Sequence, residues 1–239
     1  MKPPTPWPPI EPFLTGIRFP DPGKNPRLQV VAVGCDFRPG TILGAYRSGI
    51  FPWPHGDEVD ESGEPLVAWF SPNPRAIFPL DREPHWSRSL RRTLRHHRWS
   101  ITIDQAFGDV MRACGETRPS TWIIPELLDG YERLHELGWA HSLEVWEDGP
   151  AGRELVGGIY GLAIGALFAG ESMFHKRTDA SKVAFASLVH HLRERRFQVF
   201  DVQVMNPHLL SLGCVSVPRS EYLQMLGKAL ENPIPLVPR

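Results

Sequence analysis

Residues 179–204, DASKVAFASLVHHLRERRFQVFDVQV, decide the fold, because a helical stretch there leads directly into a strand. Asp179 can cap a helix that runs to about Arg195, since aspartate accepts hydrogen bonds from the free N–H groups of a first turn. Phe197–Val204 then has the alternating pattern of a strand. This helix and strand are the middle of a longer alternation of elements.

The flanking sequence extends that alternation in both directions. Apolar runs predict strands at His141–Trp146, Leu155–Tyr160 and Ala163–Phe168. Helices are predicted from Asp104 to Cys114, from Pro125 to Leu137, and from about Arg219. Helices and strands in this order predict an α+β fold with a central mixed sheet over residues 101–230.

The chain before residue 101 differs in composition. Of the 25 prolines in the whole chain, nine lie before residue 27, so residues 1–26 are expected to form an extended leader, on the surface or disordered. Residues 27–100 are expected to form a smaller unit with helices at Pro39–Ser48 and Ser87–His97. Ser87 can cap the second of these helices. Residues 231–239 predict a short tail.

Composition limits the classes of protein. With 41% hydrophobic and 22% charged residues and a net charge of -1, the chain is expected to be globular, without a uniformly basic surface. Its three cysteines, without a C-x-x-C pair, and the lack of a signal or membrane-spanning segment predict a cytoplasmic protein. The sequence has no P-loop, dinucleotide-binding glycine motif, G-x-S-x-G or metal-ligand spacing. We therefore expect no cofactor and no metal.

Asp201 and Gln203 are the first candidates for chemistry, because a strand places them on one face. Burying both is costly unless they are hydrogen-bonded. They are either a structural pair that fixes the next loop or a carboxylate that orients a reactive amide. Gly170 and Glu171 also allow two interpretations. They form either a simple turn or a binding site, where the glycine lets a ligand approach the backbone and the glutamate accepts a hydrogen bond from the ligand's amine.

Aromatic and basic residues suggest a second kind of contact. Trp53 and Trp122 lie at expected element boundaries, where an indole can stack on a base. Arginines cluster in and before the helix at Ser87–His97, and they form either a solvated face or a phosphate-binding patch: Arg82, Arg88, Arg91, Arg92, Arg95 and Arg98.

Ordered motifs over about residues 28–226 resemble the leucyl/phenylalanyl-tRNA–protein transferase family. The matching stretches are AYRSGIFPW (45–53), WFSPNPR (69–75), TWI (121–123), AHSLEVW (140–146), LVGGIYG (155–161), FAGESMF (168–174), ASK (180–182), DVQ (201–203) and SLG (211–213). The chain departs from the family pattern at Cys35, Phe70 and Asp179.

The resemblance implies a GNAT-like mixed-sheet catalytic domain preceded by a smaller N-terminal α/β domain. It implies an aminoacyltransferase that moves Leu or Phe, and Met less well, from charged tRNA to an N-terminal Arg or Lys. The acceptor protein is thereby marked for N-end rule degradation. The implied partners are Leu-tRNA, Phe-tRNA and these acceptors; no membrane partner is expected, and a monomer is favoured.

The resemblance also implies roles for particular residues. Asp201 and Gln203 would form the catalytic pair, and the five arginines from Arg82 to Arg95 would contact the tRNA backbone. The implied substrate-binding residues, with the tryptophans at the terminal adenosine and the apolar residues at the Leu or Phe side chain, are Trp53, Trp122, Ile159, Phe168, Gly170, Glu171, Met173 and Asn206.

Two alternatives remain open at this point. An acetyl-CoA-dependent N-acyltransferase would share the fold, although His175–Ala180 lacks the glycines that hold a pyrophosphate. A non-catalytic RNA-binding module would use only the arginine helix and the tryptophans.

Overall fold

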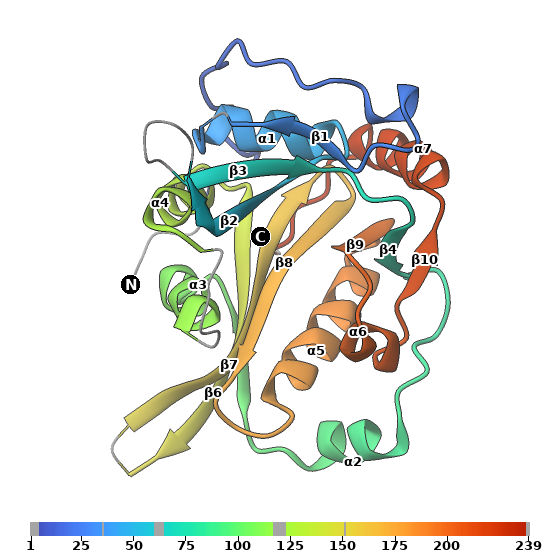
Figure 1. Cartoon of the computed structure of the whole chain (residues 1–239). Helices are drawn as coiled ribbons and strands as arrows, with labels where there is room; N and C mark the ends of the chain where they lie inside the picture. The colour runs from blue at the N-terminus through green and yellow to red at the C-terminus, as the bar shows by residue number, and fades with distance from the viewer. Residues whose placement is uncertain (1–4, 35, 60–64, 117–122, 151, 238–239) are drawn as a thin grey trace.

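A seven-stranded mixed sheet forms the centre of the computed structural model, which describes residues 5–34, 36–59, 65–116, 123–150 and 152–237 (Figure 1). Its strand order is β10-β4-β9-β8-β7-β6-β5. All neighbours are antiparallel except β8 and β9. The strands are β4 (Arg75–Phe78), β5 (Ser100–Ile103), β6 (Ala140–Gly149), β7 (Gly152–Ile164), β8 (Leu167–His175), β9 (Val199–Gln203) and β10 (Val215–Val217). The predicted α+β class with a mixed sheet is confirmed.

Helices cover both faces of this sheet and create two apolar cores. One core lies under α5 (Ala180–Glu194) and α2 (Arg88–His96). The other includes residues of α1 (Pro39–Arg47), α3 (Phe107–Glu116), α4 (Pro125–Glu136) and α7 (Arg219–Leu230). A short helix, α6 (Pro207–Ser211), follows β9. Residues of both cores line the candidate site.

The connection β8-α5-β9 makes the single parallel pair, because a parallel neighbour requires a crossover and α5 supplies it (Figure 1). The predicted helix and strand are both found. However, the prediction of a separate strand at Ala163–Phe168 is wrong, since the hairpin turn between β7 and β8 interrupts it at Gly165, where φ is +62°. A positive φ suits glycine, which has no Cβ to clash.

The predicted cap at Asp179 and the predicted start of a helix at Asp104 are also wrong. Asp179 precedes α5 but has φ +68° and makes no capping bond, because its carboxylate instead binds Lys182 and Thr93. Asp104 accepts the Ser142 N–H at 3.0 Å and contacts the His141 ring, while α3 begins only at Phe107. In both cases a group distant in sequence, the Thr93 hydroxyl or the Ser142 N–H, binds the carboxylate that could have capped the helix. Ser87 does cap α2, as predicted, by accepting the Leu90 N–H.

A second, three-stranded sheet has the order β1-β3-β2, formed by β1 (Val30–Val33), β3 (Pro65–Phe70) and β2 (Phe51–Val59). Two prolines of β2 are tolerated because β2 is an edge strand, where a missing N–H breaks no ladder. The aromatic residues of β2 are thereby presented at the side of the large sheet. Among the described residues, no helix is long and apolar enough to cross a membrane.

Parts of the stretch 27–100 belong structurally to the large sheet. β4 pairs with both β9 and β10, and α2 packs against α5. The described part of the leader runs over α1 towards α7 (Figure 1), held by a hydrogen bond from Trp139 Nε1 to the Ile10 carbonyl. The sequence-based domain bounds remain predictions.

Candidate functional site

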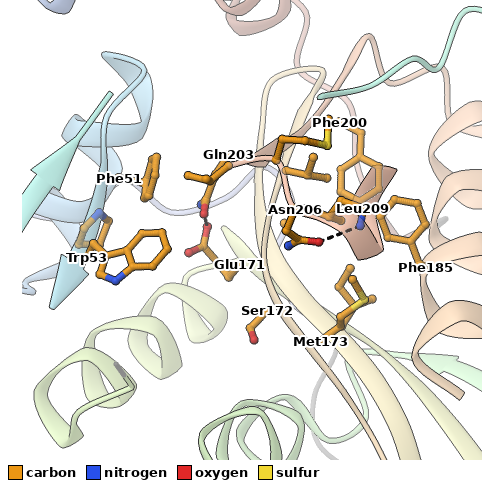
Figure 2. Close-up of a pocket in the computed structure, with 16 residues that line it drawn as sticks. Phe51, Trp53, Glu171, Ser172, Met173, Phe185, Phe200, Gln203, Asn206 and Leu209 are labelled. Atoms are coloured by element: carbon orange, nitrogen blue, oxygen red, sulfur yellow. Dashed lines mark hydrogen bonds between the residues drawn. The ribbon is translucent and has the colours of Figure 1, made fainter. Parts of the chain in front are cut away.

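The parallel strands β8 and β9 pair from Leu167 and Val199 as far as Ala169 and Asp201. Beyond these residues a pocket of about 240 Å³ is lined by Gly170 to Met173 from one strand and Val202 to Asn206 from the other side (Figure 2). Residues from β2, α5 and α6 complete its walls. The pocket therefore opens where the sheet itself splits.

A bulge in β8 aims Glu171 into this opening. The register changes from Gly161 opposite Gly170 to Tyr160 opposite Ser172, which leaves Glu171 as the extra residue. A bulge bends its strand and redirects a side chain. Gly170 allows close packing, since a Cβ there would lie 3.0 Å from the Phe200 ring.

Glu171 is the centre of a buried polar network. Its Oε1 accepts from Gln203 Nε2 at 2.8 Å (Figure 2). The same oxygen accepts from Tyr46 Oη at 2.6 Å. The Tyr46 and Tyr131 hydroxyls are 2.9 Å apart. Burial, with the nearby charge of Asp201, raises the pKa of Glu171 to about 8. Burial also raises the pKa of both tyrosines, so their hydroxyls stay protonated.

Gln203 reaches this network from a strained turn. Its φ is +65°, and the Val204 N–H donates to the Val202 carbonyl at 2.9 Å across it, as in a γ-turn. Such a backbone costs about 1–3 kcal/mol and persists only where surrounding contacts impose it. One such contact is the Gln203 N–H, which donates to Asp201 Oδ1 at 2.9 Å.

Asp201 lies behind the pocket and does not line it. It is 0% exposed and its carboxylate is bound by Arg75 Nε at 2.9 Å, Arg75 Nη2 at 2.6 Å and Tyr222 Oη at 2.8 Å. We expected this carboxylate to orient the Gln203 amide. Instead it holds the Gln203 main chain, and the side-chain amide is held by Glu171.

The opposite end of the pocket is apolar. Ile159 and Met173 of the central strands meet side chains that the sequence did not single out: Phe185, Phe200, Val202 and Leu209. Phe168 is not part of the wall but lies beneath it, with its ring centroid 5.8 Å from that of Phe200. A ligand with a polar head and an apolar side chain would match these two ends.

The rim is formed by Phe51, Pro52 and Trp53 of β2 and by Asn206. Trp53 is 37% exposed, so part of its indole faces solvent. The Asn206 Oδ1 caps α6 by accepting the Leu209 N–H at 2.9 Å, which leaves its amide nitrogen to donate. Trp122 lies outside the described residues.

The arginines in α2 and just before it lie away from this pocket. Arg82, Arg88, Arg91, Arg92 and Arg95 are exposed, and none forms an ion pair with a described acidic residue. Other exposed arginines differ, since Arg112 and Arg133, for example, are paired with acids. The helix is fixed by the buried Leu90 and by a bond from Thr93 to Asp179, just before α5.

Sequence reasoning missed Tyr46, Tyr131, Arg75 and Tyr222. Arg75, a charged residue at the start of the short apolar strand β4, was a usable signal. Tyr46 lies within the matching stretch 45–53, but that resemblance gave it no role. Among the described residues, no group of three or more His, Cys, Asp or Glu could hold a metal ion.

The family models and the curated relatives agree with one another, whereas the solved structures add nothing to them. The model of the leucyl/phenylalanyl-tRNA protein transferase family matches residues 77–227, and the model of its N-terminal domain matches residues 36–73. A solved protein of unknown function from Staphylococcus epidermidis is similar only at TM-score 0.41 and 8% identity, over 71% of this chain and 68% of that chain. That level of similarity supports no conclusion about shared fold or function.

Curated relatives named leucyl/phenylalanyl-tRNA–protein transferase cover almost the whole chain. The protein from Desulfatibacillum aliphaticivorans is 47% identical, over 94% of this chain and 93% of its own length. Those from Shewanella baltica strain OS155 and Anaeromyxobacter strain Fw109-5 are 46% and 45% identical, over 86% and 91% of this chain and 83% and 89% of their own. The chain therefore belongs to the leucyl/phenylalanyl-tRNA–protein transferase family.

Proposed function

We propose that this chain transfers Leu or Phe, and Met less well, from charged tRNA to the N-terminal Arg or Lys of an acceptor protein. Family membership supports aminoacyl transfer and makes the chain an aminoacyltransferase. The observation that carries the finer proposal is the pocket with a polar and an apolar end, since one aminoacyl group presents both.

The apolar end would take the Leu or Phe side chain. Ile159, Met173 and the ring of Phe200 offer contact to a large aliphatic or aromatic side chain. Each missing methylene would cost about 1–3 kcal/mol in such a site, which favours large apolar side chains over small ones. Phe168 would act from beneath by supporting Phe200.

The polar end would orient the attacking amine. An aminoacyl ester is already activated, and an α-amine has a pKa near 7.7–8.0, so orientation matters more than a strong base. Because Gln203 Nε2 donates to Glu171, its carbonyl oxygen is left to accept from the amine. The amine nitrogen then bonds to the ester carbonyl carbon, the bond to the ribose oxygen breaks, and the amine proton passes to that oxygen.

Glu171 would hold a cationic amine. Its Oε2 is buried and makes no hydrogen bond to a described residue, although buried polar atoms are normally partnered. An ammonium group, from the aminoacyl group or from the acceptor, would supply the missing donor. Its positive charge would also lower the pKa of Glu171 and favour the carboxylate.

The tRNA would be held at two places. Trp53, at the rim, and Trp122 would stack on the terminal adenosine, and the Asn206 amide would donate nearby. Arg82, Arg88, Arg91, Arg92 and Arg95 would contact backbone phosphates, which is supported by their exposure without acidic partners. Phosphate contacts position a nucleic acid but read little of its sequence.

The same proposal covers the organisation of the chain. A GNAT-like catalytic domain at 101–230 is supported by the crossover of α5 between β8 and β9 and by the split beyond them. The other parts of the chain would be the leader at 1–26, the smaller domain at 27–100 and the tail at 231–239. From the smaller domain, β4 joins the large sheet and α2 packs against α5. Acceptors would be marked for N-end rule degradation in the cytoplasm.

No specific observation favours an acetyl-CoA-dependent enzyme or a non-catalytic module. The carboxylate of Asp179 lies just before α5, where a bound pyrophosphate would meet negative charge. The polar network around Glu171 argues only weakly against a protein that only binds RNA, because such a network can also be structural.

The direct test is to incubate the purified protein with Leu-tRNA and a peptide that begins with Arg. Mass spectrometry should show the gain of one leucyl residue. The same peptide with an acetylated N-terminus should stay unchanged, and Gln203→Ala should slow the reaction without weakening tRNA binding. Acetylation of the peptide by acetyl-CoA, or tRNA binding without transfer, would contradict the proposal.

A further inference from the structure

Arg75 is fully buried and lies behind the pocket, where no substrate needs to touch it. Two of its nitrogens donate to the two oxygens of Asp201, and Nη1 donates to the Gly49 carbonyl at 3.1 Å. Its guanidinium also packs over the rings of Phe51 and Tyr222, 4.8 and 4.4 Å from their centroids. These contacts use all three nitrogens, so the side chain has one well-defined position.

One consequence reaches Gln203. The carboxylate that Arg75 fixes accepts the Gln203 N–H through the same Oδ1 that binds Arg75 Nε. A left-handed φ at a glutamine persists only when neighbouring contacts impose it. Arg75 therefore holds, through Asp201, the turn that sends the Gln203 amide towards Glu171.

A second consequence reaches the other wall. Phe51, which lines the pocket, packs on the Arg75 guanidinium. Gly49, whose carbonyl Arg75 binds, lies just after α1, the helix that carries Tyr46 to Glu171. The chain segment 46–51, which leads from the end of α1 to the start of β2, and the turn of β9 are thus joined by one side chain.

We propose that Arg75 is a positioning residue for aminoacyl transfer, which fixes the Gln203 turn and the segment from Tyr46 to Phe51 relative to each other across the pocket. This inference rests on the proposed function of the pocket. It requires a guanidinium, because a planar fork can bind both Asp201 oxygens and the Gly49 carbonyl at once, whereas lysine offers a compact point charge.

The test compares Arg75→Lys with the native chain in leucyl transfer to a peptide that begins with Arg. We expect kcat to fall by about tenfold or more while KM for Leu-tRNA changes by less than about threefold, since tRNA contacts are untouched. In Arg75→Ala, millimolar guanidinium should restore part of kcat and methylammonium should not. A crystal structure of Arg75→Lys should show Gln203 leaving its positive φ.

Arg219 supplies the matched control. It is also a buried arginine, but it donates to the carbonyls of Asn25, Leu28 and Ser71, none of which lines the pocket. Arg219→Lys should lose thermal stability as Arg75→Lys does, yet keep kcat within about twofold of the native value. If Arg75→Lys does not fold, Tyr222→Phe removes one bond to Asp201 and should give a smaller loss of kcat.

Native kcat in Arg75→Lys, an equal loss of kcat in Arg219→Lys, or an unchanged Gln203 φ would each overturn the inference. Absence of leucyl transfer by the native chain would instead refute the proposed function. The structure of the variant separates these outcomes, because the φ of Gln203 does not depend on activity.

Discussion

Arginine occupies two opposite settings in this molecule. Arg75 is 0% exposed and has a partner for each nitrogen, whereas the arginines of α2 are exposed and lack acidic partners among the described residues. A buried ion pair contributes little net stability but is costly to break, while exposed charge binds phosphates in a salt-dependent way. The comparison indicates that the same side chain fixes geometry in one region and attracts a ligand in the other.

The largest effect is expected from removing the ion-pair partner of the buried Arg75. Asp201→Ala leaves Arg75 as an unpaired buried charge, so the free energy of unfolding should fall by about 3–5 kcal/mol. Transfer should be abolished, while tRNA affinity, measured under conditions where the variant is folded, should remain nearly intact. Urea unfolding and the leucyl transfer assay measure the two effects. Undiminished turnover would remove Asp201 from the transfer reaction.

Glu171 offers a second test of the buried region. Unlike Asp201, it forms no ion pair with a described basic residue. Its folded pKa, about 8, is above the ordinary 4.5, so the native chain keeps a proton that the unfolded chain loses as the pH rises. The groups around it are Tyr46, Tyr131, Asp201 and Arg75. Native stability should therefore fall between pH 4.5 and 8.

Glu171→Gln removes this titration. The variant should gain about 4 kcal/mol over the native chain at pH 8 and little at pH 4, since each pKa unit corresponds to about 1.4 kcal/mol. Urea unfolding at both pH values measures the difference. A gain that is equal at the two pH values would show that Glu171 does not titrate in this window.

Charge reversal tests the exposed side. Arg91→Glu with Arg92→Glu should weaken binding of charged tRNA by about tenfold to a hundredfold and reduce the slope of log affinity against log salt by about 2. The matched control is Arg112→Glu with Arg133→Glu, which changes the net charge equally at arginines that already have acidic partners. If both pairs reduce the slope equally, α2 has no special role.

Trp53 lies at the rim of the pocket and is 37% exposed, whereas Arg75 is fully buried. Trp53→Ala should raise KM for an aminoacyl-adenosine analogue by about tenfold, because base stacking on an aromatic residue contributes about 1–3 kcal/mol. Trp53→Phe should retain most of the affinity. Steady-state kinetics with the analogue measure both, and unchanged KM in Trp53→Ala would exclude stacking there.

Local signals predicted some elements well. Pro39, Pro125 and Arg219 begin α1, α4 and α7 where the sequence placed them, because proline geometry and helix periodicity act within a few residues. Asp179 and Asp104 have the same local preference but do not cap, since Thr93 and Ser142 reach them from distant parts of the chain. Local preference is lost when a tertiary contact competes with it.

The residues of the pocket were also predicted only in part. Gln203, Glu171, Trp53, Ile159, Met173, Gly170 and Asn206 were singled out in the sequence, and the structure brings them together around one opening. Phe168 and Asp201 lie behind that opening rather than in its wall. Their position depends on where β8 and β9 separate, and no pattern within either strand specifies that point.

The sequence by itself determined the family, the mixed α+β class and seven of the sixteen residues that line the pocket, because ordered motifs and periodicity are written along the chain. Only the tertiary structure decided that Asp201 binds Arg75 and Tyr222 and that Glu171 meets Tyr46. Those contacts join residues 21 to 126 positions apart. They form because burial leaves each polar group no partner except the one that folding brings beside it.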